Sequence, residues 1–365
     1  MIARACLAGL LASALAAQDA AVPAGSAPGP IFYKPLPYGS SFTWTPLQSM
    51  VSWCYDTLQV PESFDEYKLR ERWGTVRHDL THVNSAVRQR GTWGDFINRQ
   101  VIPYRMTEKD WIPNWSLHLL GGGMVYRKTA EWLESQGAPA PYALSAVWCM
   151  TAELYQEVIE KASTKPDDEI ADVLLFRPTG MLLYSYEPFA RWVADTLKLE
   201  EWNYQPMWDP DQPRPVNARD RLVNVGQNFM ARPELFGSKV HRPFVFFGLT
   251  SLFGMSHRVS ATDSISWGYG GAVVHAQDPT VARAAGGLFW DRNGSLLASL
   301  ILNGTDDLKA RLNVYPGIVG EGRWWSPGLY VGLGRNSELQ AGLTLRILPI
   351  GWARGNRQAI VPPAK

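Results

Sequence analysis

The sequence lacks the short motifs that mark the commonest catalytic sites. It contains no Gly-x-Ser-x-Gly, no Gly-x-x-x-x-Gly-Lys-Ser/Thr and no Cys-x-x-Cys. Those motifs provide an exposed nucleophilic serine, a backbone cradle for phosphates and a pair of redox-active or metal-binding thiols. No specific reaction is therefore indicated by a motif.

Charge is also scarce. Charged residues make up 19% of the chain, and 35 Lys and Arg nearly balance 34 Asp and Glu. This balance gives no electrostatic reason to expect nucleic acid as a partner. No run of 18 apolar residues is present, so a typical membrane-spanning helix is not expected.

Aromatic residues are abundant, at 12% of the chain with 16 Trp. Indole rings favour the membrane–water interface, so we expect outer-membrane lipid as a partner. A soluble aromatic-rich domain is the alternative. Protein partners and cofactors are not indicated by the composition.

Residues 1–16 are predicted to be a signal peptide. Arg4 precedes an apolar run, and Ala14-Leu15-Ala16 fits the small-x-small rule for cleavage. A short buried helix is the alternative. Export implies the outer membrane or periplasm of a bacterium. In that oxidising compartment Cys54 and Cys149 either form a disulfide or remain two separate buried thiols.

The pattern of the mature chain changes from helical to alternating. We predict an α+β fold, in which an N-terminal helical domain precedes an antiparallel β-barrel of about eight strands. The expected segments are an extended arm with a first helix at 17–60, the helical domain at 61–200, a linker at 201–220, the barrel at 221–350 and a tail at 351–365.

The C-terminal part alternates with a period of two, as strands do. Ile265, Trp267 and Tyr269 fall on one face, with Ser264 and Ser266 on the other. Asn293-Gly294 is a hairpin-type turn. The strands are expected near Leu222, Phe244, Ile265, Ala285, Leu297, Ala310, Leu329 and Leu343. The frequency of Gly, Trp and Tyr favours an apolar face towards lipid; an apolar interior in a soluble barrel or sandwich is the alternative.

The helical domain carries an unusual set of ionisable residues between positions 115 and 184. His118 precedes Gly121-Gly122-Gly123, a run that predicts close approach of another helix. Glu153 follows an apolar run and has no oppositely charged residue four positions away, so it is expected to point inward. Asp172 lies among apolar residues. Because unpaired buried charges are costly, these three are expected to converge as catalytic residues.

Glu157 and Asp168 are expected to assist this site by binding. Glu157 lies one turn beyond Glu153, and Asp168 opens the next helix, where capping of free amides is the alternative role. The whole set is compatible with metal binding, with general acid–base chemistry or with a buried structural network.

His78-Asp79-Leu80-Thr81-His82 superficially resembles the zinc-peptidase signature, in which histidines one turn apart bind the metal. The surrounding sequence is polar and rich in Arg, and Asp replaces the usual Glu. A solvated helix face is the better interpretation.

Residues 115–184 resemble a known helical pattern. His118 with its following glycines, Glu153-Leu-Tyr-Gln-Glu157, Asp168-Glu-Ile-Ala-Asp172 and Gly180 are similar to VanZ-like membrane domains and to uncharacterised bacterial envelope proteins. The resemblance implies an envelope location and brings no established reaction.

Two functional hypotheses follow. In the first, the protein is an exported, outer-membrane-associated envelope protein with a structural or binding role. In the second, it is an envelope hydrolase or transferase that acts on lipid or glycan through His118, Glu153 and Asp172. Whether the protein is an enzyme is left open by the sequence.

Overall fold

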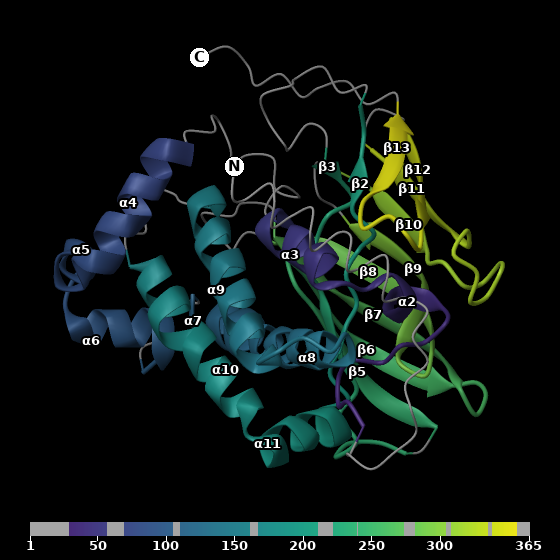
Figure 1. Cartoon of the computed structure of the whole chain (residues 1–365), viewed down its shortest axis with the longest axis horizontal. Coiled ribbons are helices and arrows are strands. Elements are labelled where there is room, and N and C mark those ends of the chain that lie inside the picture. The colour runs from purple at the N-terminus through teal and green to yellow at the C-terminus, as the bar shows by residue number, and fades with distance from the viewer. Residues whose placement is uncertain are drawn as a thin grey trace.

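Helices gather on one side of the molecule and a large sheet on the other in the computed structural model (Figure 1). The predicted α+β class is therefore confirmed. The structure describes residues 29–56, 69–104, 110–160, 167–210, 222–238, 240–273, 282–303, 308–334 and 338–355. The predicted signal peptide at 1–16 and the last ten residues of the predicted tail lie outside these ranges.

The helical half combines α-helices with wider π-helical turns. The α-helices are α2 (Gly39–Thr43), α3 (Pro46–Cys54), α4 (Leu69–Thr81), α5 (Val83–Gln89), α6 (Trp93–Phe96), α7 (Trp111–Pro113), α8 (Gly122–Ser135), α9 (Pro141–Glu160), α10 (Arg177–Ser185) and α11 (Glu187–Trp192). The π-helices are η4 (Ile97–Val101), η5 (Asn114–Gly121), η6 (Ile170–Phe176) and η7 (Val193–Leu197).

The N-terminal arm is held by a buried carboxylate of α8. Glu131 Oε2 accepts hydrogen bonds from the backbone amides of Phe32 and Tyr33, at 2.8 and 2.9 Å. Helix α3 then begins where sequence rules predict, because Thr45 caps the amide of Gln48 and Pro46 occupies the first turn. The arm and α3 are thereby fixed against the helical half.

Glycine allows α8 and α10 to pack closely, as the glycine run predicts. A Cβ atom on Gly123 would lie 2.9 Å from the carbonyl oxygen of Gly180 and would also collide with the Tyr184 ring. A Cβ atom on Gly180 would lie 2.6 Å from the carbonyl oxygen of Leu119. Any larger residue would push the two helices apart.

The sheet contains long strands and several very short ones. They are β1 (Glu200–Glu201), β2 (Met207–Trp208), β3 (Leu222–Val223), β4 (Phe229–Ala231), β5 (His241–Phe247), β6 (Thr250–Arg258), β7 (Asp263–Val273), β8 (Ala282–Arg292), β9 (Ser295–Asn303), β10 (Ala310–Val314), β11 (Pro327–Leu333), β12 (Leu339–Leu345) and β13 (Gly351–Gly355). Asn293 and Gly294 both have positive φ, 51° and 84°, and form the predicted turn between β8 and β9.

The prediction of an eight-stranded barrel is wrong. Within the described ranges the sheet has 13 strands, in the order β1-β4-β5-β6-β7-β8-β9-β10-β11-β12-β13-β2-β3, and this order does not close. Neighbouring strands are antiparallel except β13 and β2, which run parallel. Every strand expected from the alternation is present, and the additional ones are β6, β13 and three strands of two or three residues, β1, β2 and β4.

Two of the predicted segment boundaries need correction. The sequence predicts a linker at 201–220, but residues 200–208 carry β1 and β2, and their side chains are mostly buried. Residues 211–220 lie outside the described part of the chain. The predicted tail begins as β13, which pairs with β12. Both segments belong to the sheet because their backbones pair with neighbouring strands. Such pairing does not require the apolar–polar alternation by which longer strands are recognised in a sequence.

Residues 200–209 cross the inner face of the sheet, and we call them the crossing segment. The core has an aromatic centre between this segment and the sheet. Trp202 lies 5.7 Å from Phe289 and 6.1 Å from Phe244, measured between ring centroids, and all three side chains are buried. A second cluster joins α8, α9 and α10 to β4 through Phe229. The helical half is thus packed onto one end of the sheet.

Candidate functional site

His118, Glu153 and Asp172 come together in the middle of the helical half. His118 lies on η5, Glu153 on α9 and Asp172 on η6. The first and last therefore lie on π-helical turns, a conformation that is often found at functional sites. Because the three residues lie on different elements, their contact depends on how these elements pack and not on spacing along one helix.

The imidazole ring lies between two carboxylates. His118 Nδ1 is 2.6 Å from Glu153 Oε1, a short hydrogen bond. His118 Nε2 is 3.7 Å from Asp172 Oδ2, which is close enough for an ion pair but too long for a hydrogen bond. Both ring nitrogens therefore face acids of this chain.

Arg177 completes the cluster and was not expected as a member. Its Nε donates to Glu153 Oε2 at 2.7 Å, and its Nη2 is 2.5 Å from the same oxygen. Gly122 makes room for this guanidinium, because a Cβ atom there would collide with Arg177 Nη1. Glu153 thus bridges a histidine and an arginine.

Trp53 covers the same cluster from α3. The Arg177 guanidinium carbon lies 4.5 Å from the Trp53 ring centroid, and the edge of the ring meets His118 at 5.1 Å between centroids. Such cation–π and edge-to-face contacts stabilise partly desolvated cations by about 0.5 to 2 kcal/mol. The N-terminal arm therefore contributes directly to the site.

Burial and charge oppose each other at His118. Burial lowers the pKa of His118, but the negative charges of Asp172 and Glu153 and the hydrogen bond that His118 donates to Glu153 more than offset it and raise the pKa to about 9. Burial raises the pKa of Glu153, but Arg177 and His118 outweigh that effect and hold it below its usual value. The geometry favours an imidazolium, a carboxylate and a guanidinium in contact.

The pKa values of the neighbouring acids are raised, whereas that of Glu153 is lowered. Burial, increased by nearby carboxylates, raises the pKa of Glu157 well above its usual range. Burial also raises the pKa of Glu160 to about 7 and that of Asp172 well above its usual range, although His118 acts against both shifts. Glu157 Oε1 and Asp172 Oδ1 have no hydrogen-bond partner within the described ranges.

Asp168 is partly buried and forms its hydrogen bond with a neighbouring polar network. Its Oδ1 accepts a hydrogen bond from Gln100 Nε2 at 3.1 Å. Next to it, Asp167 pairs with Arg90 at 2.7 Å and with Arg99 at 2.6 Å. These contacts join the segment 83–101 to the start of η6. Asp168 is held by Gln100, and its charge still raises the pKa of Glu157, Glu160 and Asp172, so it acts electrostatically on the group around His118.

The predicted disulfide is wrong. Cys54 and Cys149 are both free and buried. Cys54 Sγ contacts the carbonyl oxygen of Ala152 at 3.4 Å, and burial raises the pKa of the Cys149 thiol to about 11. The alternative of two separate buried thiols describes the structure.

No metal site is formed by the described residues. No group of three or more His, Cys, Asp or Glu side chains among them is arranged to hold an ion. His78 and His82 stack at 4.4 Å between ring centroids, but α4 ends at Thr81 between them and both rings are largely exposed. The solvated-face interpretation of this segment is the better one.

The cluster around His118 is a buried polar network in which two atoms are left without a partner in the described part of the chain. His118, Glu153, Asp172 and Arg177 are at most 6% exposed. Both ring nitrogens of His118 face acids and Glu153 is shared by two cations, but Asp172 Oδ1 and Arg177 Nη1 have no hydrogen-bond partner within the described ranges. The paired groups stabilise the helical half, and both ring nitrogens of His118 are directed at acids of this chain.

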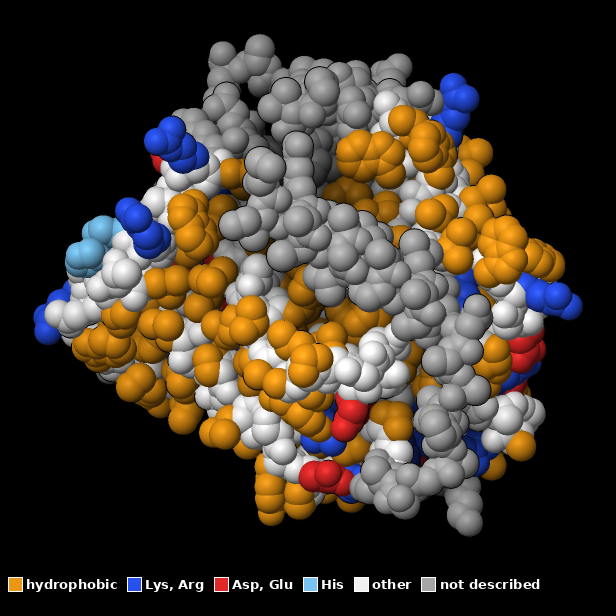
Figure 2. Space-filling model, in the orientation of Figure 1, with side chains coloured by type: hydrophobic (Ala, Val, Ile, Leu, Met, Phe, Trp, Pro, Cys, Tyr) orange, Lys and Arg blue, Asp and Glu red, His pale blue; other side chains and the backbone are white. Residues whose placement is uncertain are grey.

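A second candidate site is the outer face of the sheet. Its large apolar side chains are between 37 and 72% exposed: Phe253, Ile265, Trp267, Tyr269, Leu288, Leu300, Leu302, Leu312, Leu329, Val331, Leu333, Leu339, Leu343 and Trp352. We call this set the outer apolar face. Figure 2 shows apolar side chains gathered over the last strands and also over the helical half.

The pairing register makes the outer apolar face continuous. Trp267 lies opposite Leu288, which lies opposite Leu300, Leu312 and Val331 in turn across β7 to β11. Directly opposed residues on one face have Cβ atoms about 5 Å apart. The surface is therefore one apolar band and not a set of isolated residues.

The inner face of the sheet is apolar on β5 to β9, around Phe244 and Phe289, and carries buried polar residues on β10 and β12. Asn313, Gln340 and Thr344 are buried there, and they bond to side chains of the crossing segment and its partner strand. Thr344 Oγ1 donates to Gln205 Oε1 at 2.5 Å, and Gln340 Nε2 donates to Asp209 Oδ2 at 3.1 Å. On β10 and β12 buried polar residues lie beneath exposed leucines, which is the reverse of the usual arrangement in a soluble antiparallel sheet.

Of the helices within the described ranges, none combines the length and apolar character that a membrane crossing requires. Comparisons with family models, with curated proteins and with solved structures found no match for this chain.

Proposed function

We propose that the protein is an exported envelope protein that associates with the outer membrane through the outer apolar face and has a structural or binding role. One observation carries this proposal: a continuous band of large, exposed apolar side chains faces outward on β6 to β13. Monomeric soluble proteins rarely leave so large an apolar patch open to water.

The identity of the exposed side chains supports lipid as the material that covers this band. Trp267, Tyr269 and Trp352 are between 48 and 72% exposed and lie on the same face as the leucines. Leucine suits the hydrocarbon layer, and Trp and Tyr suit the interface where one end of the ring meets polar headgroups. The signal-like N-terminus supports an envelope location.

Strand lengths favour contact with the membrane over a complete crossing. Strands β7 and β8 have 11 residues each, but β10 and β13 have five. A tilted strand needs about 9 to 11 residues to cross a bilayer. The proposed association is therefore with one side of the membrane, into which the band is partly inserted.

The enzymatic alternative is less well supported. Acid–base chemistry needs a group that can reach a substrate, whereas His118 is 6% exposed and faces Glu153 and Asp172. The buried network is accounted for by its stabilisation of the helices that pack against the sheet.

Co-flotation of the purified mature protein with neutral phosphatidylcholine vesicles tests the proposal. The wild type is expected to float with the vesicles. Leu343→Arg, in the middle of the outer apolar face, should weaken this binding at least about tenfold, because a cation on a lipid-facing strand costs up to about 2 to 4 kcal/mol.

Ser135→Arg is the matched control, since it adds the same charge at an exposed position at the end of α8. It is expected to float like the wild type. Two results would refute the proposal: a wild-type protein that does not bind neutral vesicles at any concentration, or an equal loss of vesicle binding in the two variants.

A further inference from the structure

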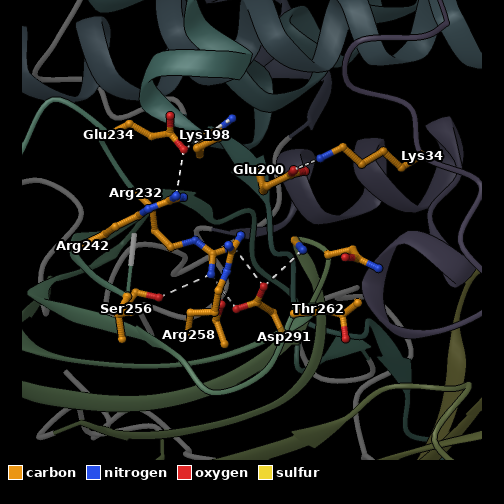
Figure 3. Close-up of a pocket in the computed structure, with 15 residues that line it drawn as sticks. Lys34, Lys198, Glu200, Arg232, Glu234, Arg242, Ser256, Arg258, Thr262 and Asp291 are labelled. Atoms are coloured by element: carbon orange, nitrogen blue, oxygen red, sulfur yellow. Dashed lines mark hydrogen bonds and ion pairs between the residues drawn. The ribbon is translucent and has the colours of Figure 1, made fainter. Parts of the chain in front are cut away.

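A cationic cavity lies at one end of β5 to β8, away from the buried His118 cluster (Figure 3). Its volume is about 230 Å³, which is smaller than the 300 to 1,000 Å³ typical of sites for drug-sized molecules. The ionisable residues that line it are Lys34, Lys198, Glu200, Arg232, Glu234, Arg242, Arg258 and Asp291. Five cations face three carboxylates, a formal excess of two positive charges (5 − 3).

Each carboxylate of the cavity is already paired. Arg232 holds Asp291 with two hydrogen bonds, at 2.8 and 2.9 Å, and Lys34 pairs with Glu200. Glu234 lies 2.9 Å from Arg242. The acids therefore neutralise three of the cations and leave the rest of the positive charge uncompensated.

Arg258 is the cation that is available to a ligand. It forms no ion pair with any carboxylate in the part of the chain that the structure describes. Lys198 is only weakly compensated, since its Nζ is 3.7 Å from a Glu234 oxygen that Arg242 already binds. Guanidinium groups bind phosphate oxygens with two parallel hydrogen bonds, which makes Arg the preferred residue for such anions.

The mouth of the cavity has exposed apolar side chains beside it. Leu235, Phe236 and Val259 are between 57 and 67% exposed, and Val240, at 48%, lines the cavity itself. The two loops that carry them are joined where the Arg258 amide donates to the carbonyl oxygen of Val240 at 2.8 Å. A cationic hollow next to exposed apolar loops suits a phosphate group attached to an apolar body.

We propose that this cavity binds a phosphate group, with Arg258 as the principal ligand and Lys198 in support. The group can belong to an anionic lipid at the membrane surface or to a free phosphorylated molecule. The lipid source rests on the membrane contact proposed above, whereas binding of the phosphate group itself does not.

The first measurement is calorimetric titration of the full mature chain with inorganic phosphate. Arg258→Gln should weaken binding at least about tenfold, because a hydrogen bond to a charged group accounts for that ratio or more. It leaves every ion pair described for the cavity in place, so the fold is expected to be retained, and its melting temperature is measured alongside. Arg323→Gln is the control: it removes the same charge from an exposed loop residue that does not line the cavity.

The second measurement compares vesicles of phosphatidylcholine alone with vesicles that also contain phosphatidic acid. A lipid source predicts tighter binding to the anionic vesicles and a loss of about fivefold in Arg258→Gln, with little change in Arg323→Gln. Phosphate binding that depends on Arg258 without any preference for anionic vesicles supports the cavity and assigns it to a free molecule.

Two results would overturn the inference: no measurable phosphate binding by the wild type, or equal losses in Arg258→Gln and Arg323→Gln. Binding to neutral vesicles without phosphate binding refutes the cavity while it leaves the proposed membrane association intact. Phosphate binding without binding to neutral vesicles refutes the proposed membrane association and supports the proposed cavity.

Discussion

Replacing Glu153 with Gln should destabilise the protein far more than its size suggests. The side chain is fully buried, and its two oxygens lie 2.6 Å from His118 Nδ1 and 2.7 Å from Arg177 Nε. The amide keeps the volume but removes the negative charge between two cations. Removal of one partner from a buried ion pair costs about 3 to 5 kcal/mol, since the remaining charge stays desolvated.

Urea denaturation at pH 7 measures this loss, with the slope of the transition checked so that only stability is compared. Glu134→Gln is the matched control, because the same substitution is made at an exposed position on α8. It should change the free energy of unfolding by less than about 0.5 kcal/mol.

Arg177→Met sharpens the test as one side of a double-mutant cycle. If Glu153 and Arg177 stabilise each other, the double variant should be more stable than the sum of the single losses predicts, by about 0.5 to 3 kcal/mol. Additive losses, or a Glu153→Gln variant as stable as Glu134→Gln, would refute the coupled network.

Two further predictions concern pH and packing. The pKa of His118, raised to about 9, means that its stabilising effect is present below the unfolded value near 6.5 and is lost as the pH rises through 9. His118→Gln should therefore flatten the fall in stability between about pH 7 and 9, a term on the order of 3 kcal/mol; an unchanged pH profile would contradict the shift. Gly123→Ala should destabilise by about 1 to 3 kcal/mol, because its Cβ atom would collide with Tyr184 and the Gly180 carbonyl. Gly74→Ala is the control, because a Cβ atom added at this helical position would have no neighbour within 4 Å, and it should stabilise the protein by about 0.5 to 1 kcal/mol. Melting temperatures that shift in the same direction in both variants would contradict the packing argument.

The sequence predicts the long strands other than β6 because their side chains alternate over many positions. Strand β7 shows this well, and its outward residues are the ones that the pattern assigns to one face. The short strands β1 and β2 cannot be found in this way, since two residues carry no period. Their place depends on partners such as Trp352 in β13, which lies opposite Trp208 from a distant part of the chain.

The candidate site is predictable where charge interrupts an apolar helix. His118, Glu153 and Asp172 give that signal, and the structure brings them together. Arg177 gives the same signal, but Pro178 next to it indicates the end of a helix. Arg177 is therefore not recognised from the sequence as a member of the cluster. Trp53 is not predictable, because nothing in its local sequence indicates that α3 packs on this cluster.

The segment 200–208 pairs with strands at both ends of the sheet. Its first residues bond to β4, whereas Met207 and Trp208 lie between β13 and β3. More than 140 positions of chain separate Trp208 from its partner Trp352. Loop-closure entropy makes contacts of such long range slow to form. During synthesis, the sheet cannot be completed until β13 has emerged, so the apolar strands made earlier must wait in an unfinished sheet that is vulnerable to aggregation.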